Sequence, residues 1–192
     1  MSRRCRPGGA PARSWWRRFP GRSRTGCLAA GADLGAIAQG LANYAGARGR
    51  LQQRKAEGGA LLLDDTYNAN PDSVRAGIDV LAATPGRKIL VLGDMGEIGQ
   101  TSAQLHDEVG GYAKSEGVDL LLAFGEMSEV AAANFGEGGA HFERIEDLVA
   151  ALRAALTPDT VVLVKGSRFM RMERVADAIA LEASGAATGG SH

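Results

Sequence analysis

The chain has 192 residues, of which 45% are apolar and 5% aromatic, a composition that supports one folded domain with a mainly aliphatic core. Its net charge of zero combines two unlike parts. Residues 1–26 hold eight arginines and no acid, which leaves 14 basic against 22 acidic residues, a charge near −8, in residues 27–192. Such an acidic body excludes a general attraction to nucleic-acid phosphates. Two cysteines exclude a disulfide framework or a structural zinc site, and no apolar run reaches the roughly 20 residues that span a bilayer.

The first 26 residues are rich in Arg, Gly and Pro and follow neither a helical nor a strand period. We expect residues 1–26 to be a disordered or misread basic leader. A basic arm that contacts nucleic acid or anionic lipid is the alternative, and the run Trp15-Trp16-Arg17-Arg18 supports it. Residues 33–44 predict a helix with Asp33 as its N-cap.

Strands and helices alternate along the rest of the chain. In order, the expected elements are an edge strand at 51–55, a strand at 60–65, a helix at 71–81, a strand at 88–92, a helix at 101–116, a strand at 120–124, a helix at 127–134, a strand at 141–144, a helix at 145–156, a strand at 161–164 and a helix at 170–183. Continuous apolar strands followed by helices are typical of a parallel sheet that is covered on both faces. We therefore expect an α/β fold with a mostly parallel, Rossmann-like sheet.

Polar residues follow the predicted strands at the ends where such sheets bind ligands. The segments concerned are 64–68, 93–97, 125–126 and 165–168. Turns that are only structural favour Gly, Asn, Asp and Pro. Lys and Arg together with carboxylates at these strand ends therefore indicate a functional site.

Four residues near the first long strand have the chemistry to bind a nucleotide. Asp65 can accept hydrogen bonds from two adjacent ribose hydroxyls, or it can serve only as a turn or cap carboxylate. Tyr67 and Asn68 can flank an adenine ring by stacking and by an amide hydrogen bond. The Arg50 guanidinium suits phosphate or ribose oxygens, although it can also be a solvated arginine beside a glycine turn. Asp64 is expected to act only as a cap.

Other strand ends carry candidates for a second ligand. Asp94, between two glycines, can meet a metal or a substrate ammonium group, or it can be a helix-start charge. Lys165, Ser167 and Arg168 can bind a carboxylate, and simple surface charge is the alternative. A lone histidine in a helix, such as His106, is more often a packed residue than a substrate contact.

These motifs resemble the C-terminal domain of the Mur ligases. The resemblance rests on LLLDDTYNANPDSVRAGIDVL (61–81), preceded by Gly49-Arg50, on VLGDMGEIG (91–99), on His106 and on VLVKGSR (162–168). The Tyr-Asn-Ala-Asn-Pro form is similar to that of the family member that adds D-alanyl-D-alanine to UDP-N-acetylmuramoyl-tripeptide. By this resemblance, residues 48–183 are the C-terminal domain, 27–47 a remnant of the central ATP-binding domain, and 184–192 a flexible tail.

The resemblance also implies a reaction and a division of roles. The family uses ATP and magnesium to activate the tripeptide carboxylate as an acyl phosphate, which the dipeptide amine then attacks. The implied ATP contacts are Arg50, Asp65, Tyr67 and Asn68. The implied dipeptide contacts are Asp94, Lys165, Ser167 and Arg168. By resemblance the domain closes over ATP and presents the dipeptide amine. From the acidic body and the lack of a bilayer-spanning or targeting segment, we expect a cytoplasmic protein without nucleic-acid or membrane partners, and we expect it to be a monomer.

The phosphate-binding loop of the family has the form G-x-x-x-x-G-K-[ST], and no Gly-Lys-Thr or Gly-Lys-Ser occurs in the 192 residues. By resemblance, the metal ligands and the UDP-sugar site also belong to other domains. We therefore expect neither a catalytic residue nor a metal ligand here, and no activity of the chain alone. A stand-alone nucleotide-binding or regulatory module, or a related Mur ligase that adds an amino acid, are the alternatives.

Overall fold

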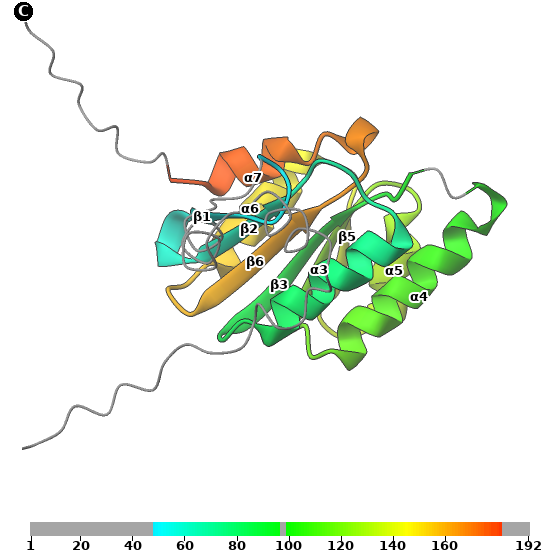
Figure 1. Cartoon of the computed structure of the whole chain (residues 1–192), viewed down its shortest axis with the longest axis horizontal. Helices are drawn as coiled ribbons and strands as arrows, with labels where there is room; N and C mark the ends of the chain where they lie inside the picture. The colour runs from blue at the N-terminus through cyan, green and yellow to red at the C-terminus, as the bar shows by residue number, and fades with distance from the viewer. Residues whose placement is uncertain (1–47, 97–98, 182–192) are drawn as a thin grey trace, which may run out of the picture. The chain divides into compact units, whose positions relative to one another are not determined.

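The structure, a computed structural model, describes residues 48–96 and 99–181 (Figure 1). The predicted leader (1–26), the predicted central-domain remnant with its helix (27–47) and the predicted tail (184–192) lie outside the described residues.

The described residues form six strands, five α-helices and three short 3-10 helices. The strands are β1 (Gln52–Lys55), β2 (Leu61–Asp65), β3 (Arg87–Gly93), β4 (Leu120–Phe124), β5 (Gly139–Phe142) and β6 (Thr160–Lys165). The α-helices are α3 (Pro71–Ala83), α4 (Ser102–Ser115), α5 (Ser128–Phe135), α6 (Ile145–Ala155) and α7 (Glu173–Ile179). The 3-10 helices are η2 (Glu57–Gly59), η3 (Gly99–Thr101) and η4 (Arg168–Met170).

The strands make one sheet in the order β1-β2-β6-β3-β4-β5, in which β1 is antiparallel to β2 and every other pair is parallel. The last strand of the chain, β6, thus lies between β2 and β3. Helices α3, α4 and α5 cover one face of the sheet, and α6 and α7 cover the other (Figure 1). The expected mostly parallel α/β fold is confirmed. No helix among the described residues is long and apolar enough to cross a membrane.

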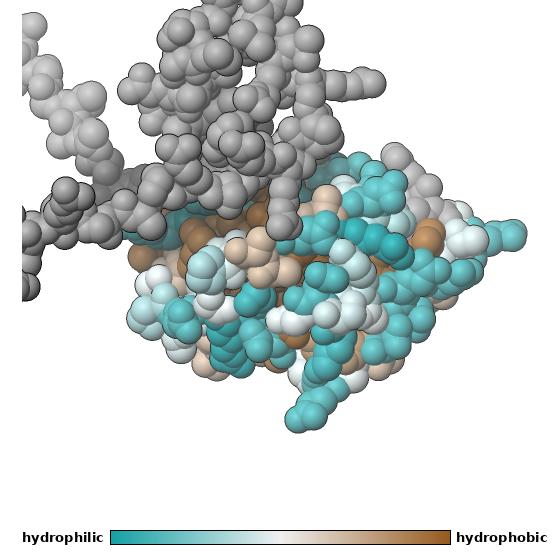
Figure 2. Space-filling model, turned by 60° about the horizontal axis from the view of Figure 1, so that its bottom comes forward, coloured by the Kyte–Doolittle hydropathy of each residue, from teal (hydrophilic) through white to brown (hydrophobic). Residues whose placement is uncertain are grey.

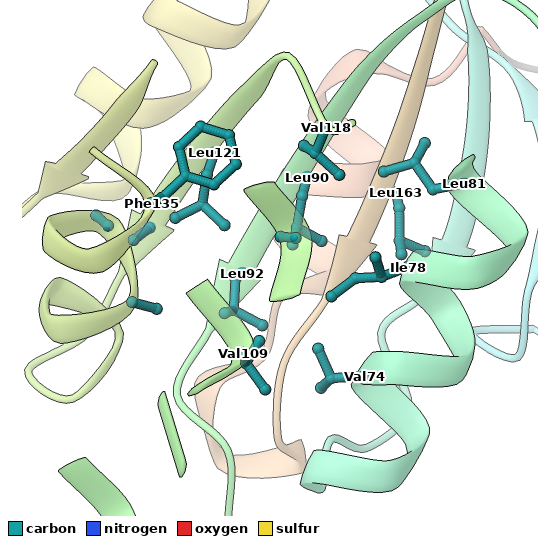
Figure 3. Close-up of a cluster of buried hydrophobic side chains, with 14 of the residues drawn as sticks. Val74, Ile78, Leu81, Leu90, Leu92, Val109, Val118, Leu121, Phe135 and Leu163 are labelled. Carbon is teal, nitrogen blue, oxygen red and sulfur yellow. The ribbon is translucent and has the colours of Figure 1, made fainter. Parts of the chain in front are cut away.

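Each face of the sheet packs its own aliphatic core, because successive side chains of a strand point to opposite faces. Leu90 and Leu92 of β3 belong to the core under α3, α4 and α5, whereas Ile89 and Val91 belong to the core under α6 and α7. Figure 3 shows the first core, where Ile78 of α3 is directed toward the strands. Each fully buried side chain of this size stabilises the fold by about 1.5–3 kcal/mol. On the face shown in Figure 2, hydrophilic residues predominate over hydrophobic ones.

Local sequence signals set the ends of α3 and the close approach of α4 to α5. The Asn70 side chain accepts a hydrogen bond from the Ser73 backbone N–H, the Ser73 side chain accepts one from the Asn70 N–H, and Pro71 occupies the first helical position. Asn70 is thus the N-cap that starts α3, at the position where the helix was expected. On α4, a Cβ at Gly110 would clash with the carbonyl oxygen of Ala131 on α5. Glycine therefore permits the contact between these two helices.

Two predicted elements differ from the structure. The helix predicted at 170–183 is shorter in the structure: α7 begins at Glu173, because Arg171 before it adopts a left-handed backbone with φ 53°, and it ends at Ile179. The strand predicted at 141–144 lies at 139–142, where its pairing with β4 begins at Gly139 opposite Leu121. Glycine at the start of β5 has low strand propensity, which hid the beginning of the strand.

Candidate functional site

Three loops meet at the carboxyl ends of β2, β3 and β6, because these strands are parallel neighbours. The Gly96 N–H donates to the Ala69 carbonyl at 3.2 Å, and the Ser167 N–H donates to the Asp94 carbonyl at 2.9 Å. The loop after β3 therefore joins the loop after β2 to the loop after β6. This end of the sheet is where ligands bind in open α/β folds.

The structure brings together the four residues predicted to bind a nucleotide. Arg50 lies over the ring of Tyr67, with 4.3 Å between Cζ and the ring centroid. The Tyr67 N–H donates to the Gly49 carbonyl at 2.9 Å, which holds residues 49–51 against the end of β2. Tyr67 is 50% exposed and Asn68 is also exposed, so both remain accessible at the surface next to Asp65.

Backbone conformation places this segment. Gly49 has φ 72°, and a Cβ there would lie 3.1 Å from the Tyr67 nitrogen, so the position favours glycine on both counts. Leu51 has φ 51°, a left-handed conformation that is uncommon for a residue with a side chain. In this conformation its N–H donates to Oδ1 of Asp65 at 3.1 Å. This contact of Leu51 could not be predicted from the sequence, where the Gly-Arg turn just before Leu51 was the only signal.

Asp65 forms an ion pair with Lys165. Their strand positions are opposite each other in the β2–β6 register, and Lys165 Nζ lies 2.5 Å from Asp65 Oδ2. The Lys165 side chain is 2% exposed and that of Asp65 is 14% exposed. Nζ also donates to the Asn68 carbonyl at 2.9 Å. Burial raises the pKa of the Asp65 carboxyl, and the nearby Lys165 ammonium opposes that effect.

This pair changes the view of the site that the sequence suggested. The motifs assigned Asp65 to ATP and Lys165 to the dipeptide, on separate loops. The structure instead joins Lys165 to two residues of the predicted nucleotide group, Asp65 and Asn68. Both nucleotide and dipeptide roles stay predictions, but they concern side chains in direct contact.

Asp94 is 9% exposed and is bonded within the protein. Its Oδ1 accepts from the Ser128 N–H at 2.8 Å, at the start of α5. Gly125 has φ 119° and passes so close to this carboxylate that a Cβ would lie 2.5 Å from Oδ1. The geometry matches the alternative of a helix-start charge. Nowhere in residues 48–96 and 99–181 do three His, Cys, Asp or Glu side chains group in a way that could hold a metal ion.

His106 is fully buried and uses both ring nitrogens. Nε2 accepts from the Met95 N–H at 2.9 Å, so this nitrogen carries no proton. Nδ1 lies 2.7 Å from the Ser102 carbonyl oxygen, to which it therefore donates as the protonated nitrogen of a neutral ring. His106 is thus the packed residue that was expected. The sequence did not reveal that His106 also fixes the loop after β3, through its bond with the Met95 N–H.

The loop after β6 presents the exposed Arg168. Arg168 is 67% exposed and lies 3.5 Å from Glu173, while the neighbouring Phe169 is 65% exposed. Ser167 is 1% exposed, and its Oγ has no hydrogen-bond partner among the described residues. Of the two cations predicted to bind a carboxylate, only Arg168 is open to solvent.

Asp64 has the capping role that was expected. Its Oδ1 accepts from the N–H and the hydroxyl of Thr66, and its Oδ2 lies 3.1 Å from Arg54. With these contacts filled, the carboxylate is 1% exposed. Asp64 thus stabilises the turn after β2 as a buried residue.

A hollow of about 540 Å³ lies at the opposite, amino end of the strands. Its lining residues are Arg87, Lys114, Gly117, Val118, Asp119, Leu120, Glu137 and Gly138. None of the predicted site residues lines it. The chemistry of the polar loops, rather than this hollow, therefore identifies the candidate site.

Proteins of known sequence are similar to most of this chain. The family described as "Mur ligase, glutamate ligase domain" matches residues 49–168. UDP-N-acetylmuramoyl-tripeptide--D-alanyl-D-alanine ligase of Escherichia coli (strain K12) is 41% identical over 154 residues, which cover 79% of this chain and 34% of that protein. The ligase of the same name from Bacillus subtilis (strain 168) is 30% identical over 159 residues, 77% of this chain and 35% of that protein. The chain thus spans about a third of the length of these relatives.

Solved structures agree with this relationship. Crystal structure I of MurF from Acinetobacter baumannii superposes with a TM-score of 0.68 at 33% identity and covers 81% of this chain and 35% of that one. The crystal structure of MurF ligase from Thermotoga maritima in complex with ADP gives a TM-score of 0.67 at 27% identity, over 80% of this chain and 35% of that one. The chain therefore belongs to the Mur ligase family, and its described residues form the C-terminal domain of that family.

Proposed function

We propose that this domain closes over ATP and presents the amine of D-alanyl-D-alanine in a ligase that extends UDP-N-acetylmuramoyl-tripeptide during peptidoglycan precursor synthesis. The observation that carries the proposal is the convergence of Arg50, Asp65, Tyr67 and Asn68 beside the loop that bears Arg168. The names of the relatives and the ADP complex of the Thermotoga maritima protein support it. The proposal includes a monomeric, cytoplasmic enzyme without nucleic-acid or membrane partners.

In this proposal the end of β2 binds the nucleoside part of ATP. Each Asp65 oxygen has one protein donor, Leu51 on Oδ1 and Lys165 on Oδ2. An ionised carboxylate offers about four acceptor positions, so each oxygen keeps the capacity to accept from a ribose hydroxyl. The exposed Tyr67 and Asn68 side chains offer a ring and an amide to the adenine, and Arg50 offers a guanidinium to ribose or phosphate oxygens.

The loop after β6 binds the dipeptide. Arg168 is exposed and can pair with the dipeptide carboxylate, since a guanidinium matches a carboxylate with two parallel hydrogen bonds. The buried Ser167 hydroxyl, without a partner among the described residues, can donate to the same group. Asp94 contributes through the loop it stabilises, because Ser167 donates to its carbonyl.

The reaction joins a carboxylate to an amine. The tripeptide carboxylate oxygen attacks the γ-phosphorus of ATP, ADP leaves, and an acyl phosphate forms. The dipeptide amine then attacks the acyl carbon, phosphate leaves with the bonding electrons, and the amine loses its proton. Magnesium would neutralise phosphate charge in the first step. In this proposal its ligands come from other domains of the ligase.

A chimera tests the proposal. Residues 48–181 would replace the homologous segment of the Escherichia coli ligase, and ADP and product formation would be measured with UDP-N-acetylmuramoyl-tripeptide and D-alanyl-D-alanine. We expect turnover that depends on both substrates and does not occur when D-alanine or D-glutamate replaces the dipeptide. The parent enzyme is the control. A folded chimera that is inactive beside an active parent, or that accepts a single amino acid equally well, would contradict the proposal.

A further inference from the structure

We infer that Lys165 is a positioning residue of the nucleotide subsite, which holds the Asp65 carboxylate and the Asn68 carbonyl in place for the ribose, and that it is not a contact of the dipeptide. The inference rests on the proposed function, in which Asp65 binds the ribose. It reassigns a residue that the sequence motif placed with the dipeptide.

Lys165 already makes contacts with the nucleotide group of residues. An ammonium group has three N–H donors. One donates to Asp65 Oδ2 at 2.5 Å and another to the Asn68 carbonyl at 2.9 Å. Both acceptors belong to the end of β2 and the loop that follows it. The charge of Lys165 therefore acts on the nucleotide group of residues.

The Lys165 side chain is also buried. With 2% of its side chain exposed and its ammonium already bonded to Asp65 and Asn68, Lys165 has almost no surface to offer to an incoming ligand. The similarly buried Ser167 differs, because its hydroxyl has no partner among the described residues. A dipeptide carboxylate would reach Nζ only by displacing Asp65, which would leave a buried carboxylate without its counter-charge, an arrangement of high energy. Arg168, three residues further along, is exposed and needs no such exchange.

The Asp65 carboxylate is bonded on both of its oxygens. The Leu51 N–H holds one carboxylate oxygen and the Lys165 ammonium holds the other, so rotation of the carboxylate is restricted from both sides. Two adjacent ribose hydroxyls need two oxygens in a fixed orientation. Without Lys165, only the single 3.1 Å bond from Leu51 would orient Asp65.

The ribose preference of the 192-residue chain provides the test. Affinities for ADP, for 2′,3′-dideoxy-ADP and for D-alanyl-D-alanine would be measured by NMR titration. The variants are Lys165→Met, Asp65→Asn and the double variant. Lys88→Met is the matched control, because Lys88 is partly buried and also donates to a backbone carbonyl, but at the opposite end of the sheet.

We expect wild-type chain and Lys88→Met to prefer ADP over the dideoxy compound by roughly tenfold or more, the effect of hydrogen bonds to a charged group. Lys165→Met and Asp65→Asn should lose this preference. Their affinities for dideoxy-ADP and for the dipeptide should stay within about twofold of wild type, because neither ligand has ribose hydroxyls that bond to Asp65, and loss of such a bond changes affinity by far more than twofold. The double variant should be no worse than Asp65→Asn, because the two residues act as one unit.

Each other outcome overturns something specific. If Lys165→Met keeps the ribose preference, or selectively loses dipeptide affinity, the inference is wrong and the proposed function survives. If wild-type chain has no ribose preference, the ribose role of Asp65 and the inference both fail. Should Lys165→Met not fold by circular dichroism, the double variant, which carries no uncompensated carboxylate, replaces it. A further loss of ADP affinity in the double variant relative to Asp65→Asn then refutes the inference.

Discussion

Replacing His106 with leucine should destabilise the domain by about 3 kcal/mol, although no ligand is involved. The buried Met95 N–H loses its acceptor, Nε2, and an unsatisfied buried donor costs roughly 1–3 kcal/mol. The bond from Nδ1 to the Ser102 carbonyl is also lost, which removes roughly another 0.5–1.5 kcal/mol. Leucine fills a similar volume, so the added packing cost is small.

The measurements are urea unfolding followed by circular dichroism and hydrogen exchange of the Met95 amide. For a domain of this size, about 3 kcal/mol corresponds to a decrease in Tm of roughly 10 °C. Exchange at Met95 should accelerate more than exchange in the central strands. The Gly96 bond to Ala69 and the Asp94 bond to Ser167 should loosen with it, because all belong to the same loop.

His141→Leu is the control for loss of a histidine. His141 is only partly buried and has one bond, from Nε2 to the Gly125 carbonyl at 3.0 Å, so its replacement should cost less than about 1.5 kcal/mol. One result would contradict this reasoning: the free energy of unfolding of His106→Leu lies within about 0.5 kcal/mol of the wild-type value, below the usual cost of an unsatisfied donor, and the Met95 amide stays protected from exchange. The role assigned to His106 in holding the loop would then be refuted.

Two further predictions concern other parts of the fold. Tyr112 donates to Asp79 at 2.5 Å, and this bond raises its pKa to about 12. Because the folded pKa lies above the unfolded value, the stabilisation by this bond is present below pH ~10 and is lost as the pH rises through about 12. In a titration of phenolate absorbance, Tyr112→Phe should remove the component with the highest midpoint, and its persistence would contradict the assignment. Gly110→Ala should destabilise the domain by about 1–3 kcal/mol through its clash with Ala131, whereas Gly111→Ala, which shares the gain in helix propensity and meets only a side-chain end, should not. Equal unfolding midpoints in urea for the two alanine variants would argue against the clash.

The sequence by itself determined most of the secondary structure and the strand ends at which the candidate site residues lie. Apolar runs predicted the strand Leu120–Phe124 at its observed bounds, and α3 begins at Pro71, where the helix at 71–81 was expected to begin. These features depend on residues close together in the chain, so local periodicity and capping chemistry are enough to predict them. The left-handed Arg171, which delays the start of the last predicted helix, had no such local signal.

Only the tertiary structure decided which polar residues touch. Asp65 and Lys165 are 100 positions apart, and they meet because β6, the last strand in the chain, lies beside β2. Likewise, His106 contacts Met95 only once α4 is packed on the sheet. Strand order and register follow from how both faces are buried together, a property of the whole chain that no short pattern contains. The motif therefore identified Lys165 as a candidate site residue, and only the fold showed that its ammonium contacts the Asp65 carboxylate.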